Sequence, residues 1–239
     1  MNKFSRRQFF VTAIFLVASV VTTSAAIGAE TDKPRIGVIG AGRVGTALGG
    51  AWIKAGYEVM FSSRTLEDDQ ALADQLGPSA YAGTPREAAA FGDVLLVSVP
   101  LTALPDIGET LGDLLDGKIV IDTSNAYERR DGELATEALE KGIAVFDAEM
   151  LPGARLVRAF NAIGFPTMGS AIDNPGRLGM PIAGADDEAV EVAKTLISDI
   201  GFVPVVVGDW ESANLLRSGG PFSGELSPEQ IREIVDSLK

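Results

Sequence analysis

The stretch Pro34–Arg64 constrains the fold of this chain more than any other, because it places a strand, a glycine-rich turn and a helix in one order. Ile36–Ile39 is a short apolar run typical of a buried strand. Gly40, Gly42 and Gly45 follow at the spacing G-x-G-x-x-G, and a helical segment and a second strand-like run come next. This order predicts a β-α-β unit that opens an α/β fold.

The glycine spacing has a physical reason at each position. Gly40 permits a tight turn out of the strand, Gly42 leaves room for a pyrophosphate against the backbone, and Gly45 allows close packing of helix on strand. The phosphates then lie at the helix N-terminus, where free N–H groups and the helix dipole favour an anion. We therefore predict a dinucleotide site; the alternative is a glycine-rich turn in some other α/β protein.

Residues at the end of the second strand-like run indicate which dinucleotide binds. A site for NAD has Asp or Glu about 20 residues after the glycines, bonded to the ribose 2′-hydroxyl. Ser62, Ser63 and Arg64 stand there instead, and hydroxyls with a guanidinium suit a 2′-phosphate. We expect NADP(H); the alternative is that Arg64 is solvated or pairs with the acids at 67–69.

The remaining sequence alternates helical segments with strand-like apolar runs. This pattern predicts a doubly wound, mostly parallel sheet of the Rossmann NAD(P)-binding type, as a single domain over 34–239 with a short C-terminal extension. Further strands are expected at 80–82, 94–99, 118–121, 156–160, 180–183 and 202–207, and the longer helices at 66–76, 104–115, 186–200 and 228–238.

Polar or shape-specific residues follow three of these strands, where ligands bind in such sheets. They are Ser98–Leu101, Asp122–Asn125 and Asn161–Gly164. Turn formation and helix capping are the alternatives for the first two groups. For Asn161, a functional role and a role in a turn are equally open.

Composition restricts the chemistry. The 239 residues carry a formal net charge of −13 and include neither His nor Cys. The negative charge argues against a nucleic-acid partner. The commonest general base and the commonest metal ligand are absent, and disulfides and cysteine-bound metals are excluded. We therefore name no catalytic residue and no metal site.

Residues 1–29 have the pattern of a signal peptide: a basic start, an apolar run and a small-residue region. Arg6 and Arg7 with the phenylalanines after them resemble the twin-arginine export signal of bacteria. We expect export to the periplasm or the extracellular space through that machinery, with cleavage after Ala26 or Ala29. The alternative is an uncleaved membrane anchor, for which the apolar run is short.

Several segments together resemble the NADPH-dependent reductases of the 8-hydroxy-5-deazaflavin coenzyme, coenzyme F-420. The similar segments are 36–49, 61–64, 96–100, 154–164 and 181–209, among which AFNAIG and GADDEA are more specific than the glycine motif. The same fold resembles the N-terminal domain of pyrroline-5-carboxylate reductases and the cytosolic domain of six-transmembrane metalloreductases. The resemblance implies direct hydride transfer between a nicotinamide and a deazaflavin held face to face.

The resemblance also implies roles for individual residues. The pyrophosphate loop would be Gly40, Gly42, Arg43, Val44 and Gly45, and the 2′-phosphate site would include Ser63 and Arg64. The adenosine-ribose wall would be Val99, Pro100 and Leu101, and the nicotinamide pocket would include Asn161, Ile163 and Phe165.

Two positions depart from the family. Asn161 stands where the best-known members have His, and Thr65 where they have a second basic residue. The first departure leaves the electron acceptor open, and the second bears on phosphate affinity. Reduction of a small imine or carbonyl, and a non-catalytic NADP-binding module, are the alternative functions. A small-molecule redox acceptor is the expected partner, and a second copy of the chain is a further candidate.

Overall fold

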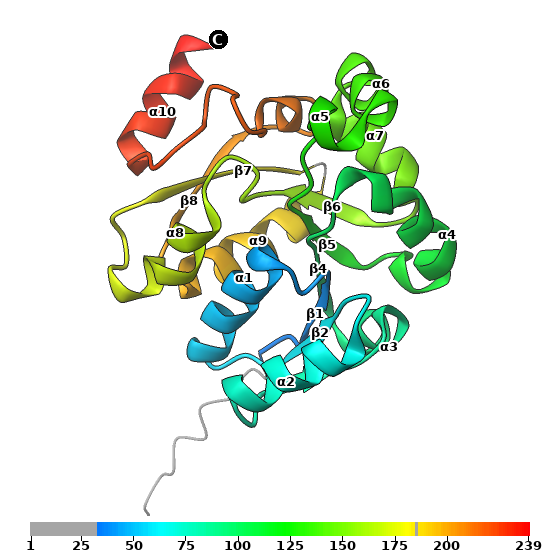
Figure 1. Ribbon diagram of the computed structural model, residues 1–239. Coiled ribbons are helices and arrows are strands. Elements are labelled where there is room, and N and C mark those ends of the chain that lie inside the picture. The colour runs from blue at the N-terminus through cyan, green and yellow to red at the C-terminus, as the bar shows by residue number, and fades with distance from the viewer. Residues whose placement is uncertain (1–32, 185) are drawn as a thin grey trace, which may run out of the picture. The chain divides into compact units, whose positions relative to one another are not determined.

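A sheet of eight strands runs through the described part of the chain, residues 33–184 and 186–239, in the computed structural model (Figure 1). The spatial order is β3-β2-β1-β4-β5-β6-β7-β8. The strands are β1 Ile36–Ile39, β2 Val59–Ser62, β3 Ala80–Ala82, β4 Val94–Val97, β5 Ile119–Asp122, β6 Arg155–Arg158, β7 Gly179–Gly184 and β8 Val203–Gly208. The expected signal segment 1–29 lies outside the described residues.

The strands from β1 to β6 are parallel, whereas β7 is antiparallel to β6 and β8 is parallel to β7. Because β7 runs in the opposite direction, it starts at the edge of the sheet where β6 ends. The first residues of β7 therefore lie at the carboxyl edge of the parallel strands. This edge is where ligands bind in doubly wound sheets.

Helices cover both faces of the sheet (Figure 1). They are α1 Arg43–Lys54, α2 Leu66–Leu76, α3 Pro85–Phe91, α4 Leu104–Leu115, α5 Glu128–Asp131, α6 Glu133–Lys141, α7 Ile143–Met150, α8 Phe165–Ser170, α9 Asp187–Asp199 and α10 Pro228–Ser237. Short 3-10 turns lie at Leu101–Ala103, Ala171–Asp173 and Glu211–Leu215. Helices α1, α8 and α9 bury side chains on one face of the sheet, and α3, α4, α6 and α7 on the other.

The core follows from these two layers. On the α1 side, the fully buried Trp52 packs among strand and α9 residues and donates its indole N–H to the Leu196 carbonyl at 3.0 Å. A third apolar cluster joins α10 to β7 and β8 around Ile231 and Phe222. Within residues 33–184 and 186–239, no helix is both long and apolar enough to cross a membrane.

The expected fold class, a doubly wound and mostly parallel α/β sheet, is confirmed. Helices α2 and α4 have the predicted bounds, and the capping box at Thr84 forms as its sequence indicates. The strands were placed within one or two residues of their observed ends. Helices α5 to α8, none of which is longer than nine residues, were not predicted.

Candidate functional site: a dinucleotide groove and a buried cavity

The three glycines after β1 have different surroundings. Gly40 has a φ of 105°, and a Cβ there would lie 2.3 Å from the Ser98 carbonyl oxygen. A Cβ on Gly45 would lie 2.2 Å from the Gly40 carbonyl oxygen. A Cβ on Gly42 would meet no atom of the described residues within 4 Å, and Gly42 is exposed. Two glycines therefore shape the turn, while the third keeps the surface in front of the backbone open.

This opening lies at the N-terminus of α1. Gly42 is the N-cap residue and has no side chain that could accept from the first N–H groups of the helix. These donors suit a phosphate, and the first turn carries no acid that would oppose one. The residues therefore fit the pyrophosphate of a dinucleotide.

An open groove of about 580 Å³ continues from the loop toward α8. The guanidinium of Arg43 lies 5.5 Å from the centre of the Phe165 ring on the opposite side. Val44 turns instead toward the core and packs against it. The groove is lined by Ala41, Gly42, Arg43, Thr46, Ala47, Phe165, Pro166 and Gly169.

Ser62, at the end of β2, supports the glycine loop from below. Its hydroxyl is fully buried and donates to the Val38 carbonyl at 2.7 Å. Its own carbonyl accepts from the N–H groups of Gly40 and Ala41, both at 2.9 Å. This corrects our expectation for Ser62, because its hydroxyl is not available to a ligand.

Ser63 and Arg64 lie at the ligand-facing end of the same strand. The hydroxyl of Ser63 donates to the carboxylate of Asp69, a buried residue of α2, at 2.9 Å. Arg64 is exposed and takes part in none of the ion pairs found within the described residues. The guanidinium of Arg64 is therefore available for a phosphate.

The wall expected after β4 is only partly exposed. Val99 is half-buried and Pro100 is exposed. Leu101 is fully buried and packs with the α3 and α4 side of the core. This corrects the expectation for Leu101, since its side chain stabilises the fold and does not face the groove.

The end of β6 brings Asn161 to the carboxyl edge in a constrained conformation. Phe160 before it has a φ of 65°, which is uncommon for a residue other than glycine and marks local strain. Asn161 is 5% exposed, and its Nδ2 donates to the carbonyls of Asp122 at 3.2 Å and Ser124 at 2.9 Å. The side chain thus ties the end of β6 to the end of β5.

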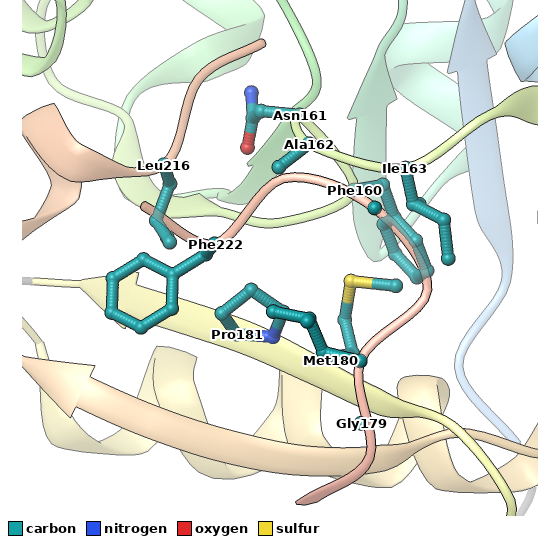
Figure 2. A pocket seen from close by; sticks show the side chains of 11 residues that line it. Phe160, Asn161, Ala162, Ile163, Gly179, Met180, Pro181, Leu216 and Phe222 are labelled. Carbon is teal, nitrogen blue, oxygen red and sulfur yellow. The ribbon is translucent and has the colours of Figure 1, made fainter. Parts of the chain in front are cut away.

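The other amide atom of Asn161, Oδ1, is buried and has no hydrogen-bond partner within residues 33–184 and 186–239. Figure 2 shows this oxygen turned toward the cavity residues and the amide nitrogen turned away. The cavity measures about 10 Å³, roughly the space of one water molecule. Its lining is apolar apart from Asn161 and comprises Phe160, Ala162, Ile163, Gly179, Met180, Pro181, Leu216, Phe222, Gly224 and Leu226.

A buried ionic cluster under Asn161 was not found by sequence reasoning. The fully buried Arg158 bonds through Nη1 to the carboxylates of Asp122 and Asp147, which are also fully buried. Its Nη2 donates to the carbonyls of Ser124 at 2.9 Å and Leu216 at 3.1 Å. Charged residues inside apolar segments were the available signal, because a buried charge needs a partner.

The cluster contains two carboxyl groups and one guanidinium, and this excess of acidic groups affects the pKa of Asp147. Burial and the neighbouring carboxylate of Asp122 raise the pKa of Asp147 to about 9, although Arg158 and Ser124 oppose the shift. The folded protein therefore holds a proton on Asp147 that the unfolded chain releases near its ordinary pKa of 3.8. Because the native state binds more protons in this range, this group lowers stability as pH rises from 3.8 to about 9.

We expect Asp147→Asn to remove most of this pH-dependent loss, because an amide replaces the protonated carboxyl without ionising. Urea midpoints between neutral pH and about pH 9 should fall less in the variant than in the wild type. Asp113→Asn, which alters an exposed acid paired with Arg86, should leave the wild-type decline unchanged. An equal decline in Asp147→Asn and wild type would contradict the assignment.

This chain is similar to known oxidoreductases. Residues 35–126 match the family described as NADP oxidoreductase, coenzyme F-420-dependent. A metalloreductase of Rattus norvegicus, STEAP3, is 26% identical over 184 residues, which cover 76% of this chain and 35% of the relative. A mitochondrial 3-hydroxyisobutyrate dehydrogenase-like protein of Arabidopsis thaliana is 27% identical over 82% of this chain and 57% of the relative. The chain thus spans about a third of the length of the metalloreductase and just over half of the length of the dehydrogenase-like protein.

Solved structures show the same fold. A hypothetical protein of Sinorhizobium meliloti has a TM-score of 0.66 and 28% identity, covering 79% of this chain and 92% of that one. An Arthrobacter protein provisionally assigned as an F-420-dependent NADP reductase has a TM-score of 0.59 and 22% identity. The similarity covers 76% of this chain and 87% of that one. A pyrroline-5-carboxylate reductase of Coxiella burnetii has a TM-score of 0.57 and 16% identity, covering 79% of this chain and 65% of that one. The last two identities establish the fold alone.

Proposed function

We propose that this chain transfers a hydride between NADP(H) and a deazaflavin-type acceptor, because residues 35–126 match the coenzyme F-420-dependent NADP oxidoreductase family. The family consists of NAD(P)-binding oxidoreductases, and the chain shares its Rossmann-like fold. The proposal adds two points to this: the acceptor is of the deazaflavin type, and the protein prefers NADP(H) to NAD(H).

The phosphate end of the site carries the proposal. Gly42 leaves the α1 N-terminus open in front of the backbone, and Ser63 and Arg64 lie at the end of the adjacent strand β2. An open helix N-terminus suits the pyrophosphate. The guanidinium of Arg64, which has no ion-pair partner in the described part of the chain, suits a 2′-phosphate. Asp69 accepts from Ser63 and so orients its hydroxyl.

The nicotinamide end would extend along the groove between α1 and α8 toward Ile163 and Asn161. When bound, NADPH would supply a hydride to the acceptor ring, and the proton that completes the reduction would come from water. The role of the chain would be to hold the two rings close together. No titratable side chain is among the described residues that line the cavity, which suits direct transfer without a protein acid or base.

Binding of NADPH and NADH to the purified protein tests the cofactor proposal directly. We expect NADPH to bind more tightly by about 10-fold or more, because the 2′-phosphate adds a charge-assisted contact. Isothermal titration with both nucleotides gives the ratio. Equal affinities, or tighter binding of NADH, would contradict the preference for NADP(H).

Replacing Arg64 should alter this ratio. We expect Arg64→Ala to weaken the binding of NADPH on the order of 10- to 100-fold and the binding of NADH much less. Only NADPH carries the phosphate that the guanidinium would contact. Arg232→Ala, which removes an equal charge from the exposed face of α10, is the matched control and should alter neither affinity. If Arg64→Ala weakened both nucleotides equally, Arg64 would not bind the 2′-phosphate.

We also propose that the protein acts after export, because of the twin-arginine pattern at Arg6 and Arg7. This route carries folded proteins, so a bound nucleotide could accompany the chain. Fusing residues 1–29 to a reporter that is active only outside the cytoplasm tests the signal. Export that persists when both arginines are changed to Lys would contradict the proposed route.

A further inference from the structure

Arg43, the first residue of α1, carries a charge that its surroundings do not compensate. Its side chain is exposed and takes part in none of the ion pairs found among residues 33–184 and 186–239. A cation is unfavourable at the positive end of a helix, and the first turn of α1 holds no acid. An anion bound in front of α1 would relieve this repulsion.

The ring of Phe165, the first residue of α8, faces the Arg43 guanidinium across the groove. The guanidinium carbon lies 5.5 Å from the centre of the ring, within the range of a cation–π contact. Helix α8 holds the ring there because it packs closely against α1 (Figure 1). Small residues permit this approach, since a Cβ on Gly169 would lie 3.5 Å from the Cβ of Ala47.

An aromatic ring holds a guanidinium differently from a carboxylate. A cation–π contact attracts the guanidinium without neutralising its charge, and it uses none of the five N–H donors. These donors stay available for a phosphate, to which Arg binds through parallel hydrogen bonds. Phe165 is a large apolar side chain and yet is 37% exposed at the groove. The contact therefore orients Arg43 and leaves it able to bind an anion.

We propose that Phe165 is a positioning residue for the dinucleotide: its ring holds the Arg43 guanidinium at the groove, where the guanidinium pairs with the pyrophosphate. This inference rests on the dinucleotide binding of the proposed function, but it needs neither the 2′-phosphate nor the acceptor. It differs from a direct contact of Phe165 with the nicotinamide, which the family resemblance implies. The groove that both side chains line measures about 580 Å³, which is ample for a pyrophosphate.

A ligand without the nicotinamide separates these two roles of Phe165. ADP-ribose 2′-phosphate keeps the pyrophosphate and the 2′-phosphate of NADP but lacks the nicotinamide. Phe165→Leu removes the ring and keeps an apolar side chain. We expect this variant to bind ADP-ribose 2′-phosphate and NADPH more weakly by the same factor, about 2- to 5-fold, which is the size of an exposed cation–π contact. A loss of affinity for NADPH alone would show a direct nicotinamide contact and overturn the proposal.

Two further variants are the controls for this titration. Phe165→Tyr keeps the ring and should bind both ligands with wild-type affinity. Phe91→Leu removes a ring that lies 5.1 Å from another guanidinium, that of Arg35. Because Arg35 precedes β1, this pair lies at the edge of the sheet opposite the groove, and both affinities should stay unchanged. If Phe165→Tyr bound as weakly as Phe165→Leu, or Phe91→Leu lost as much affinity, the Phe165 ring would not be the positioning group.

A double-mutant cycle tests whether Phe165 acts through Arg43. Arg43→Gln removes the charge and should weaken the binding of both ligands about 10-fold. Adding Phe165→Leu to this variant should have no further effect, because no guanidinium remains to be positioned. Both side chains are exposed, so the variants should stay folded, which circular dichroism checks. An effect of Phe165→Leu that is the same with and without Arg43 would overturn the proposal.

These results distinguish the positioning role from the proposed hydride transfer. If the cycle shows coupling but coenzyme F-420 is not reduced, the positioning role stands and the hydride transfer fails. If coenzyme F-420 is reduced while Phe165→Leu binds ADP-ribose 2′-phosphate as tightly as the wild type, the hydride transfer stands and the positioning role fails. If the wild-type protein binds neither ADP-ribose 2′-phosphate nor NADPH, both fail.

Discussion

Gly42→Val should abolish binding of both NADPH and NADH while leaving the protein folded. A Cβ at this position meets no protein atom within 4 Å, so the side chain should be accommodated in the free protein. The branched side chain would instead occupy the space in front of the α1 N-terminus, where the pyrophosphate approaches the backbone. The loss should be on the order of 1,000-fold in affinity, equivalent to about 4 kcal/mol.

Gly112→Val is the matched control for this variant. Gly112 lies on α4, away from the groove, and a Cβ there also meets no atom within 4 Å. Gly112→Val should bind both nucleotides with wild-type affinity, and circular dichroism should show that both variants are folded. Wild-type affinity in folded Gly42→Val would mean that the glycine loop does not bind the dinucleotide.

Arg158→Met should cause the largest loss of stability. The substitution keeps an apolar side chain of similar length but leaves the buried carboxyl groups of Asp122 and Asp147 without their cation. It also removes donors from the carbonyls of Ser124 and Leu216. Loss of one partner from a buried pair costs about 3–5 kcal/mol, which urea unfolding measures.

The exposed pair of Arg86 with Asp113 offers a control with the same substitution. Arg86→Met should leave the urea midpoint nearly unchanged, because water screens this pair. Arg158→Met at wild-type stability would show that the buried cluster contributes nothing to folding.

Local sequence signals predicted the framework of the site well. The glycines after β1 combine a fixed spacing with a preceding apolar run, and both signals lie within one short segment. The same is true of the capping residues Thr84 and Ser227, whose partners lie three residues away. Features that depend on neighbours in the sequence were therefore predictable from the sequence.

Features that depend on distant residues were not predictable in this way. The sequence does not say that the Ser62 hydroxyl turns toward Val38 or that Leu101 packs into the core. The Asp122, Asp147 and Arg158 cluster joins three segments that only the folded sheet brings together. The antiparallel direction of β7 likewise follows from tertiary packing.

Asn161 combines a feature that the sequence predicted with one that it did not. Its position after an apolar strand identified it as a site candidate, with a turn role as the alternative. Its amide nitrogen in fact bonds the carbonyls of Asp122 and Ser124, which lie on another strand end and not in its own turn. The amide oxygen has no hydrogen-bond partner among the described residues, and no sequence pattern distinguishes these two atoms.

A stopped-flow experiment without oxygen tests the proposed hydride transfer from NADPH to a deazaflavin most directly. The purified protein is mixed with NADPH and coenzyme F-420, and the visible absorbance of the deazaflavin is followed together with NADPH oxidation. We expect both signals to fall at one rate in a ratio of one to one, and deuterium at the transferred position of NADPH to slow them. Bound NADPH with an unchanged deazaflavin absorbance would contradict the claim.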